Sequence, residues 1–128
     1  MKKTLCSFGL LGLLSTLLTG CTTTITNLTP SAQKRNPASL YPFEVALDTR
    51  QQSIRQETLK PYLVIGDQIY PMEHTLQIPN RWETVVPIPA NKEYINYRFK
   101  FDYDYRSIPQ ARPGSQLSRP FQLHILEK

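Results

Sequence analysis

Residues 95–105 read INYRFKFDYDY, and this stretch decides the fold. Aromatic and branched side chains alternate strictly along it with polar ones. One face carries Ile95, Tyr97, Phe99, Phe101, Tyr103 and Tyr105; the other carries Asn96, Arg98, Lys100, Asp102 and Asp104. A period of two residues is typical of a β-strand with one face in the core and one in water. We therefore predict a central antiparallel strand.

Shorter signals of the same kind lie on both sides of this stretch. The further expected strands are 41–48, 62–65, 68–72, 75–78, 84–88 and 121–125. Gly66-Asp67 joins two of them and fits a type II′ hairpin turn. Residues 49–59, with the isolated Ile54, are expected as a long loop or a single helical turn. About seven short strands in roughly 90 residues predict an all-β fold, a small antiparallel β-sandwich.

Residues 89–94 (PANKEY), leading into Tyr97-Arg98-Phe99, resemble the approach to the penultimate strand of immunoglobulin-like and fibronectin type III domains. The resemblance implies an Ig-like sandwich over residues 40–128. It also implies that Tyr94 or Tyr97 hydrogen-bonds back across the corner at the start of this strand. The Cys–Trp–Cys core of true immunoglobulin domains is absent, and a fold of this kind implies no particular ligand.

The N-terminus has the organisation of a secretion signal. Met1-Lys2-Lys3 precedes an uncharged run, residues 5–18, that contains seven leucines. The run is shorter than the roughly 20 residues that a membrane-spanning helix needs. It ends in Leu18-Thr19-Gly20-Cys21, which resembles the lipobox of bacterial lipoproteins. The resemblance implies that residues 1–20 are a cleaved signal peptide, with a diacylglycerol on the sulfur of Cys21 and an acyl group, such as palmitate, on its new amine.

Cys21 is the sole cysteine after residue 20, so no disulfide can form within the mature chain. The alternatives are an ordinary signal peptide with an incidental cysteine and an uncleaved anchor. Thr22 follows Cys21 where enterobacterial lipoproteins kept at the inner membrane have Asp, so the same resemblance implies the outer membrane. Residues 21–39 are polar and are expected as a tether, in which residues 23–28 are β-branched enough to form a first edge strand.

The residue types needed for catalysis or metal binding are sparse. Glu73, His74 and His124 could bind a metal ion, but two scattered histidines are a poor ligand signature. Asp102 and Asp104 could act as paired carboxylates, but Arg and Lys share their strand face, which favours ordinary surface pairing. We therefore predict no enzyme, no metal and no cofactor other than the lipid on Cys21.

Arg106, Arg112 and Arg119 are the first candidates for a binding site. They lie in or beside the proline-rich stretch 107–120, which is expected as the loop between the last two strands. An arginine patch there would suit an anionic glycan, a lipid headgroup or an acidic protein. The alternative is an ordinary solvated loop. Removing the signal lowers the formal charge from +5 to +3, and with no aromatic–basic motif this excludes nucleic acid as a partner.

Trp82 is the second candidate. The sequence from Trp82 through Val85-Val86-Pro87-Ile88-Pro89 to residues 97–99 resembles starch-binding carbohydrate modules, in which a tryptophan stacks on sugar rings. The alternative is that this single tryptophan belongs to the core. The sequence thus predicts a non-catalytic envelope lipoprotein that is a structural or protein-interaction module, with a carbohydrate-binding module as the alternative.

Overall fold

The computed structural model describes residues 23–127, so the expected signal peptide and Cys21 lie outside the described residues. These described residues form ten strands and one 3₁₀ turn. In order they are β1 (Thr23–Asn27), β2 (Ala32–Lys34), β3 (Leu40–Thr49), η1 (Gln56–Thr58), β4 (Lys60–Ile65), β5 (Gln68–Pro71), β6 (Glu73–His74), β7 (Arg81–Pro87), β8 (Tyr94–Tyr105), β9 (Arg112–Leu117) and β10 (Phe121–Leu126). None of the described segments is a helix of the length and apolarity needed to cross a membrane.

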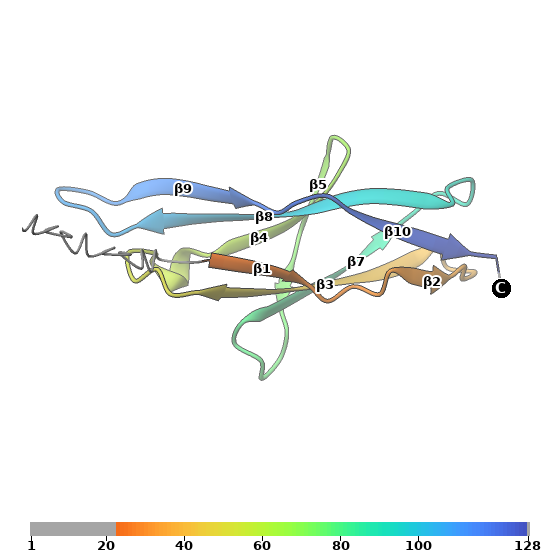
Figure 1. Cartoon of the computed structure of the whole chain (residues 1–128), viewed down its shortest axis with the longest axis horizontal. Helices are drawn as coiled ribbons and strands as arrows, with labels where there is room; N and C mark the ends of the chain where they lie inside the picture. The colour runs from red at the N-terminus through yellow and green to blue at the C-terminus, as the bar shows by residue number, and fades with distance from the viewer. Residues whose placement is uncertain (1–22, 128) are drawn as a thin grey trace, which may run out of the picture.

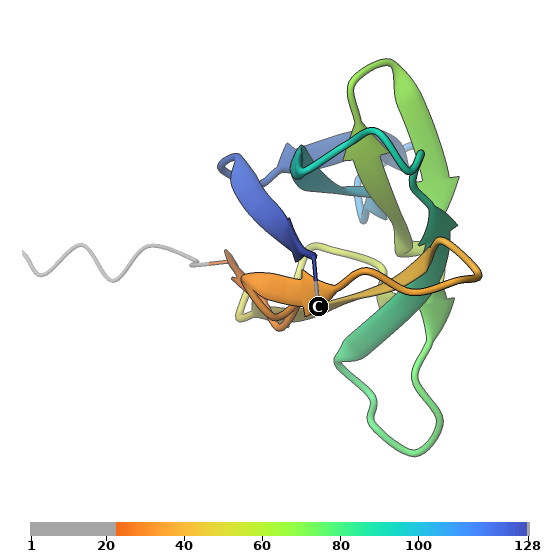
Figure 2. The same cartoon turned by 90° about the vertical axis from the view of Figure 1, so that its right-hand side faces the viewer.

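The strands form two facing sheets, and the predicted all-β sandwich is confirmed (Figures 1 and 2). One sheet has the order β1-β3-β7-β6, and the other has the order β2-β10-β8-β4-β5, with β9 also paired to β8. All neighbours are antiparallel except β2 and β10, which are parallel. When β2 is counted as A′ and β5 as C′, the first sheet has the A-B-E-D order of an immunoglobulin-like sandwich.

The core lies between the sheets and is built by the alternation seen in the sequence. Along β8, the side chains of Ile95, Tyr97, Phe99, Phe101 and Tyr103 are buried, as predicted. From the facing sheet, β3 contributes Phe43, whose ring packs edge-on against Tyr97 with centroids 4.9 Å apart. Cross-sheet aromatic contacts of this kind hold together a sandwich whose described residues, 23–127, contain no cysteine.

Two strands lie in the stretch for which the sequence predicts a tether. β1 pairs with β3 along its whole length, which confirms the expected edge strand, and β2 pairs with β10. The sandwich therefore includes residues 23–34 as well as those from residue 40 on. The prolines and polar residues of this stretch have the composition of a tether. Edge strands tolerate both kinds of residue, so composition does not reveal that this stretch pairs with the sheets.

The structure agrees with the sequence at two loops and replaces one predicted strand with a turn. The β4–β5 hairpin turns at Gly66, whose φ of 60° is the left-handed value that the first position of a type II′ turn requires. Residues 49–59 contain the η1 turn, and Ile54 anchors them in the core. The predicted strand at 75–78 is wrong: Leu76 is 87 % exposed and Gln77 has a φ of 66°, so this short apolar run is a turn.

The sequence predicts that residues 107–120 form one loop, and this prediction is wrong. The stretch contains β9. β9 and β10 pair in succession with the same edge of β8 and form one interrupted strand (Figure 1). The interruption is at residues 118–120, where Pro120 lacks a backbone donor. The Oγ of Ser118 fills the gap in the ladder by accepting a hydrogen bond from the Phe99 N–H, at 2.9 Å.

Candidate functional site

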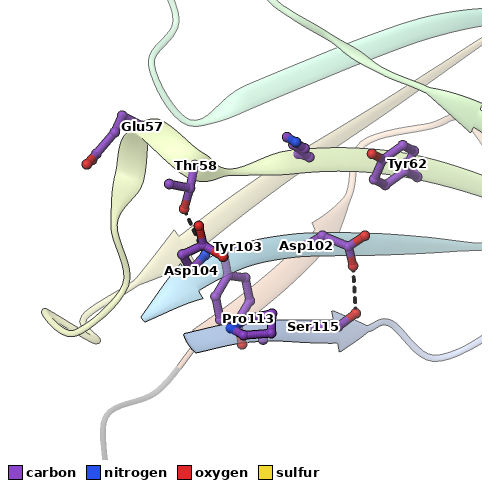
Figure 3. A pocket seen from close by; sticks show the side chains of 10 residues that line it. Glu57, Thr58, Tyr62, Asp102, Tyr103, Asp104, Pro113 and Ser115 are labelled. Atoms are coloured by element: carbon purple, nitrogen blue, oxygen red, sulfur yellow. Dashed lines mark hydrogen bonds between the residues drawn. The ribbon is translucent and has the colours of Figure 1, made fainter. Parts of the chain in front are cut away.

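An acidic groove lies on the side of the sandwich formed by η1, β4, β8 and β9 (Figure 3). Its volume is about 690 Å³. Ten residues line it: Glu57, Thr58, Lys60, Tyr62, Asp102, Tyr103, Asp104, Pro113, Gly114 and Ser115. These residues come from three separate stretches of the chain, and the pairing of β8 with β4 on one edge and β9 on the other brings them together.

The 3₁₀ turn η1 is fixed against β8 through Thr58. The Thr58 hydroxyl accepts a hydrogen bond from the backbone N–H of Asp104 at 2.8 Å and donates one to the carbonyl of Arg55 at 2.6 Å. Glu57 therefore has a defined place at one end of the groove, where Arg55 pairs with it at 3.0 Å. A hydrogen bond from its own backbone N–H, and then the Arg55 guanidinium, lower the pKa of the Glu57 carboxyl.

The carboxylate of Asp102 is held by two neighbours on the sheet. Asp102 accepts a hydrogen bond from the Ser115 hydroxyl at 2.8 Å and lies 3.5 Å from the Lys100 ammonium (Figure 3 shows the serine contact). At the base of the groove, burial and then the Tyr105 hydroxyl at 3.1 Å raise the pKa of Tyr103 to about 12. Of the three carboxylates in the lining, Glu57 pairs with Arg55 and Asp102 pairs with Lys100, whereas Asp104 makes no ion pair within residues 23–127. Asp104 is therefore the carboxylate that a positively charged or hydrogen-bonding side chain of a partner would match.

The three candidate arginines do not form one patch, so the predicted arginine-rich loop is wrong. Arg106 and Arg112 stand at the two ends of the β8–β9 hairpin, whereas Arg119 follows β9. The six residues of β9 separate Arg119 from the hairpin by about 20 Å at the rise of a strand. The Arg119 guanidinium instead covers the ring of Phe121, 4.6 Å from its centroid.

Trp82 belongs to the core. Its side chain is 7 % exposed, and its ring packs edge-on against Phe101 and His74, each with centroids 5.5 Å apart. Its position on β7 faces the opposite sheet, so neither face of the indole is free to stack on a sugar. The carbohydrate alternative therefore loses the residue on which the sequence resemblance depends.

The suggested metal ligands lie on different sheets. Glu73 and His74 lie on β6 of the four-stranded sheet, and His124 lies on β10 of the other. The Nε2 of His74 donates to the carbonyl of Pro79 at 2.8 Å, and the ring of His124 stacks on Tyr94 with centroids 4.5 Å apart. Within residues 23–127, no three His, Cys, Asp or Glu side chains gather to hold a metal ion.

The sequence pattern identifies Asp102 and Asp104 but does not identify Glu57, Thr58 and Tyr62 as their neighbours. The polar residues at alternate positions of β8 identify its exposed face. No local pattern of the sequence indicates that η1 closes one end of the groove on that face. A scan of the chain against models of known protein families finds no match, and a search of curated proteins finds no significant relative. The functional argument therefore depends on the residues and their geometry.

Proposed function

We propose that this chain is a lipid-anchored lipoprotein of the bacterial cell envelope and acts as a non-catalytic structural or protein-interaction module. One observation carries the proposal: Cys21, the sole cysteine after the signal-like segment, precedes the first residue of the sandwich, Thr23, by two positions. A thiol with no partner at the end of a lipobox-like sequence is suited to acylation. Thr22 favours sorting to the outer membrane.

The lipid would hold the domain at the membrane surface. Each buried methylene contributes about 0.8 kcal/mol, so two or more acyl chains give an essentially permanent anchor. Because β1 starts at Thr23, the proposed anchor joins the folded domain almost directly. Such an arrangement restricts the positions that the domain can take above the membrane.

The non-catalytic role is supported by the state of the titratable side chains. His74 is bonded to a backbone carbonyl, the Nε2 of His124 lies 3.3 Å from a carboxylate oxygen of Glu93, and Asp102 is held by Ser115 and Lys100. A general base needs an acceptor that is free to take a proton in a substrate pocket. These contacts favour a surface that binds a partner over one that performs a reaction.

The acidic groove is the face we propose for a partner protein. It is open, it has three carboxylates, and Tyr62 provides a partly exposed aromatic ring on its wall. Aromatic side chains are enriched in protein-binding surfaces. A partner segment with Lys or Arg side chains would match the charge.

The anchor is tested by metabolic labelling with an alkyne fatty acid and by the mass of the mature protein. Cys21→Ala should abolish labelling and leave a precursor of higher mass. Cys6→Ala is the matched control, because Cys6 lies in the expected signal and should be dispensable. Unchanged labelling of Cys21→Ala would refute the lipid anchor.

The partner face is tested by crosslinking in cells with a photoreactive residue at Tyr62. Val85, exposed on the other sheet, is the matched control position. We expect a discrete protein adduct from position 62 that disappears in Asp102→Asn/Asp104→Asn and on raising the salt concentration, because exposed charges are screened. Equal adducts from both positions would contradict a role of the groove.

A further inference from the structure

The β8–β9 hairpin loop, residues 106–111, combines an exposed apolar side chain with two cations. Ile108 is 98 % exposed, beside Pro109, and Arg106 and Arg112 flank the loop. Within residues 23–127, neither arginine lies within ion-pair distance of an acid. An almost fully exposed isoleucine between two unpaired arginines differs from an ordinary solvated loop, in which polar side chains cover the tip.

This loop lies at the end of the sandwich where the described chain begins. Thr23, the first residue of β1, pairs with Thr49 at the end of β3, and their hydroxyls are 2.9 Å apart. Four residues later, the carbonyl of Ser53 accepts a hydrogen bond from the Arg106 N–H at 2.7 Å. Figure 1 shows the hairpin as the element that projects furthest at this end.

The hairpin extends beyond the reach of the anchor. Cys21 precedes Thr23 by two positions, with Thr22 between them, and an extended chain covers at most about 7 Å over that separation. Residues 23–25 line a hollow together with residues 116–119, so β1 begins opposite the second half of β9. Arg112 is four residues before Gln116, which places the hairpin about 13 Å further toward the same end.

From this geometry we propose that the β8–β9 hairpin loop is a membrane-contact site that rests on an anionic phospholipid surface. The inference rests on the proposed acylation of Cys21. With an anchor shorter than the projection of the hairpin, the domain meets the bilayer through this loop. Ile108 enters the interfacial region, and Arg106 and Arg112 bind lipid phosphates. Arg50, exposed directly after β3, adds a cation at the same end.

The test uses the full-length chain, processed and acylated in cells, with Ile108→Cys. When the sulfur of Cys21 bears lipid, the new cysteine is the single free thiol of the mature protein and takes an environment-sensitive fluorophore. The labelled protein is reconstituted in phosphatidylcholine–phosphatidylglycerol vesicles with and without a spin-labelled lipid. Leu76→Cys is the matched control, because Leu76 is 87 % exposed on the β6–β7 loop, away from this end.

We expect a blue shift and lipid-borne quenching at position 108 and neither at position 76. Adding Arg106→Gln and Arg112→Gln should reduce the quenching at position 108. Acylated protein with a water-exposed probe at both positions would overturn the membrane contact and leave the lipid anchor standing. Shielding of position 108 without quenching by lipid would assign the loop to a contact between two copies and also overturn it. Mature protein without acyl mass would overturn the proposed function and this inference together.

Discussion

The side-chain amide of Asn27 donates a hydrogen bond of 2.8 Å to the hydroxyl of Tyr97, 70 residues further along the chain. Asn27 is the last residue of β1, and Tyr97 lies on β8 of the opposite sheet. The other side of the same amide, Oδ1, accepts from the backbone N–H of Thr29 at 3.0 Å. One side chain thus joins the two sheets and fixes the turn toward β2, so the N-terminal segment is part of the sandwich. The expected tyrosine corner is replaced by this contact, since Tyr94 instead stacks on His124.

Asn27→Ala should lower the free energy of unfolding by about 1–2 kcal/mol, because the buried Tyr97 hydroxyl loses its donor and Thr29 loses its acceptor. Urea unfolding followed by circular dichroism measures the change. Asn96→Ala is the control, because Asn96 is exposed and bonds only to the side chain of Gln122. Equal effects of the two substitutions would contradict a structural role for the Asn27–Tyr97 contact.

Ser118→Ala should destabilise the protein by about 1–3 kcal/mol, since it leaves the buried N–H of Phe99 without an acceptor at the break between β9 and β10. Ser115→Ala, an exposed serine on β9 that bonds to Asp102, should cost less than about 1 kcal/mol. Hydrogen exchange offers a site-specific readout, in which the Phe99 amide should lose protection in Ser118→Ala alone. A Phe99 amide that stays protected would refute this role of Ser118.

Trp82 should fluoresce at short wavelength, resist quenching by acrylamide and ignore a panel of envelope glycans, because its indole is buried between the sheets. Trp82→Ala should cost about 3–5 kcal/mol of stability, as expected for a large aromatic core side chain. Tyr94→Ala removes a half-exposed ring and should cost much less. A quenchable tryptophan whose emission shifts with one glycan would restore the carbohydrate alternative.

Stability should fall in alkaline solution through Tyr103. Burial, and then Tyr105, raise the pKa of Tyr103 to about 12, whereas in an unfolded chain it is about 10. Between these pH values the unfolded chain releases the proton and the folded one retains it, so the free energy of unfolding decreases as pH rises. Below pH 10 this contribution is fully present.

Urea unfolding at a series of pH values measures this decrease. Tyr103→Phe should make the decline of stability with pH shallower. Part of the decline should remain, because burial also raises the pKa of Tyr97. An identical pH profile in Tyr103→Phe would exclude Tyr103 as its source. A spectrophotometric titration of tyrosinate should show in parallel that the late-titrating component shrinks in this variant.

Period-two alternation identified the strands that carry the core. In β3 and β8 every second side chain faces the core, so the alternation of apolar and polar residues shows directly which side chains are buried. The same argument fails for residues 75–78, because four residues of mixed character contain too little periodicity to distinguish a strand from a turn. It fails again for β9, where Pro113 and Gly114 give the composition of a loop, yet pairing with β8 holds the segment extended.

The sequence by itself determined the sandwich class, the hairpin at Gly66 and the lipobox-like position of Cys21, because each depends on neighbours within a few residues. The tertiary structure decided the burial of Trp82, the separation of the three arginines and the assembly of the acidic groove. It also decided that β1 and β2 belong to the sandwich and that the β8–β9 hairpin projects beyond Thr23. These properties depend on the register between strands distant in the chain, where a displacement of one residue changes which side chains meet.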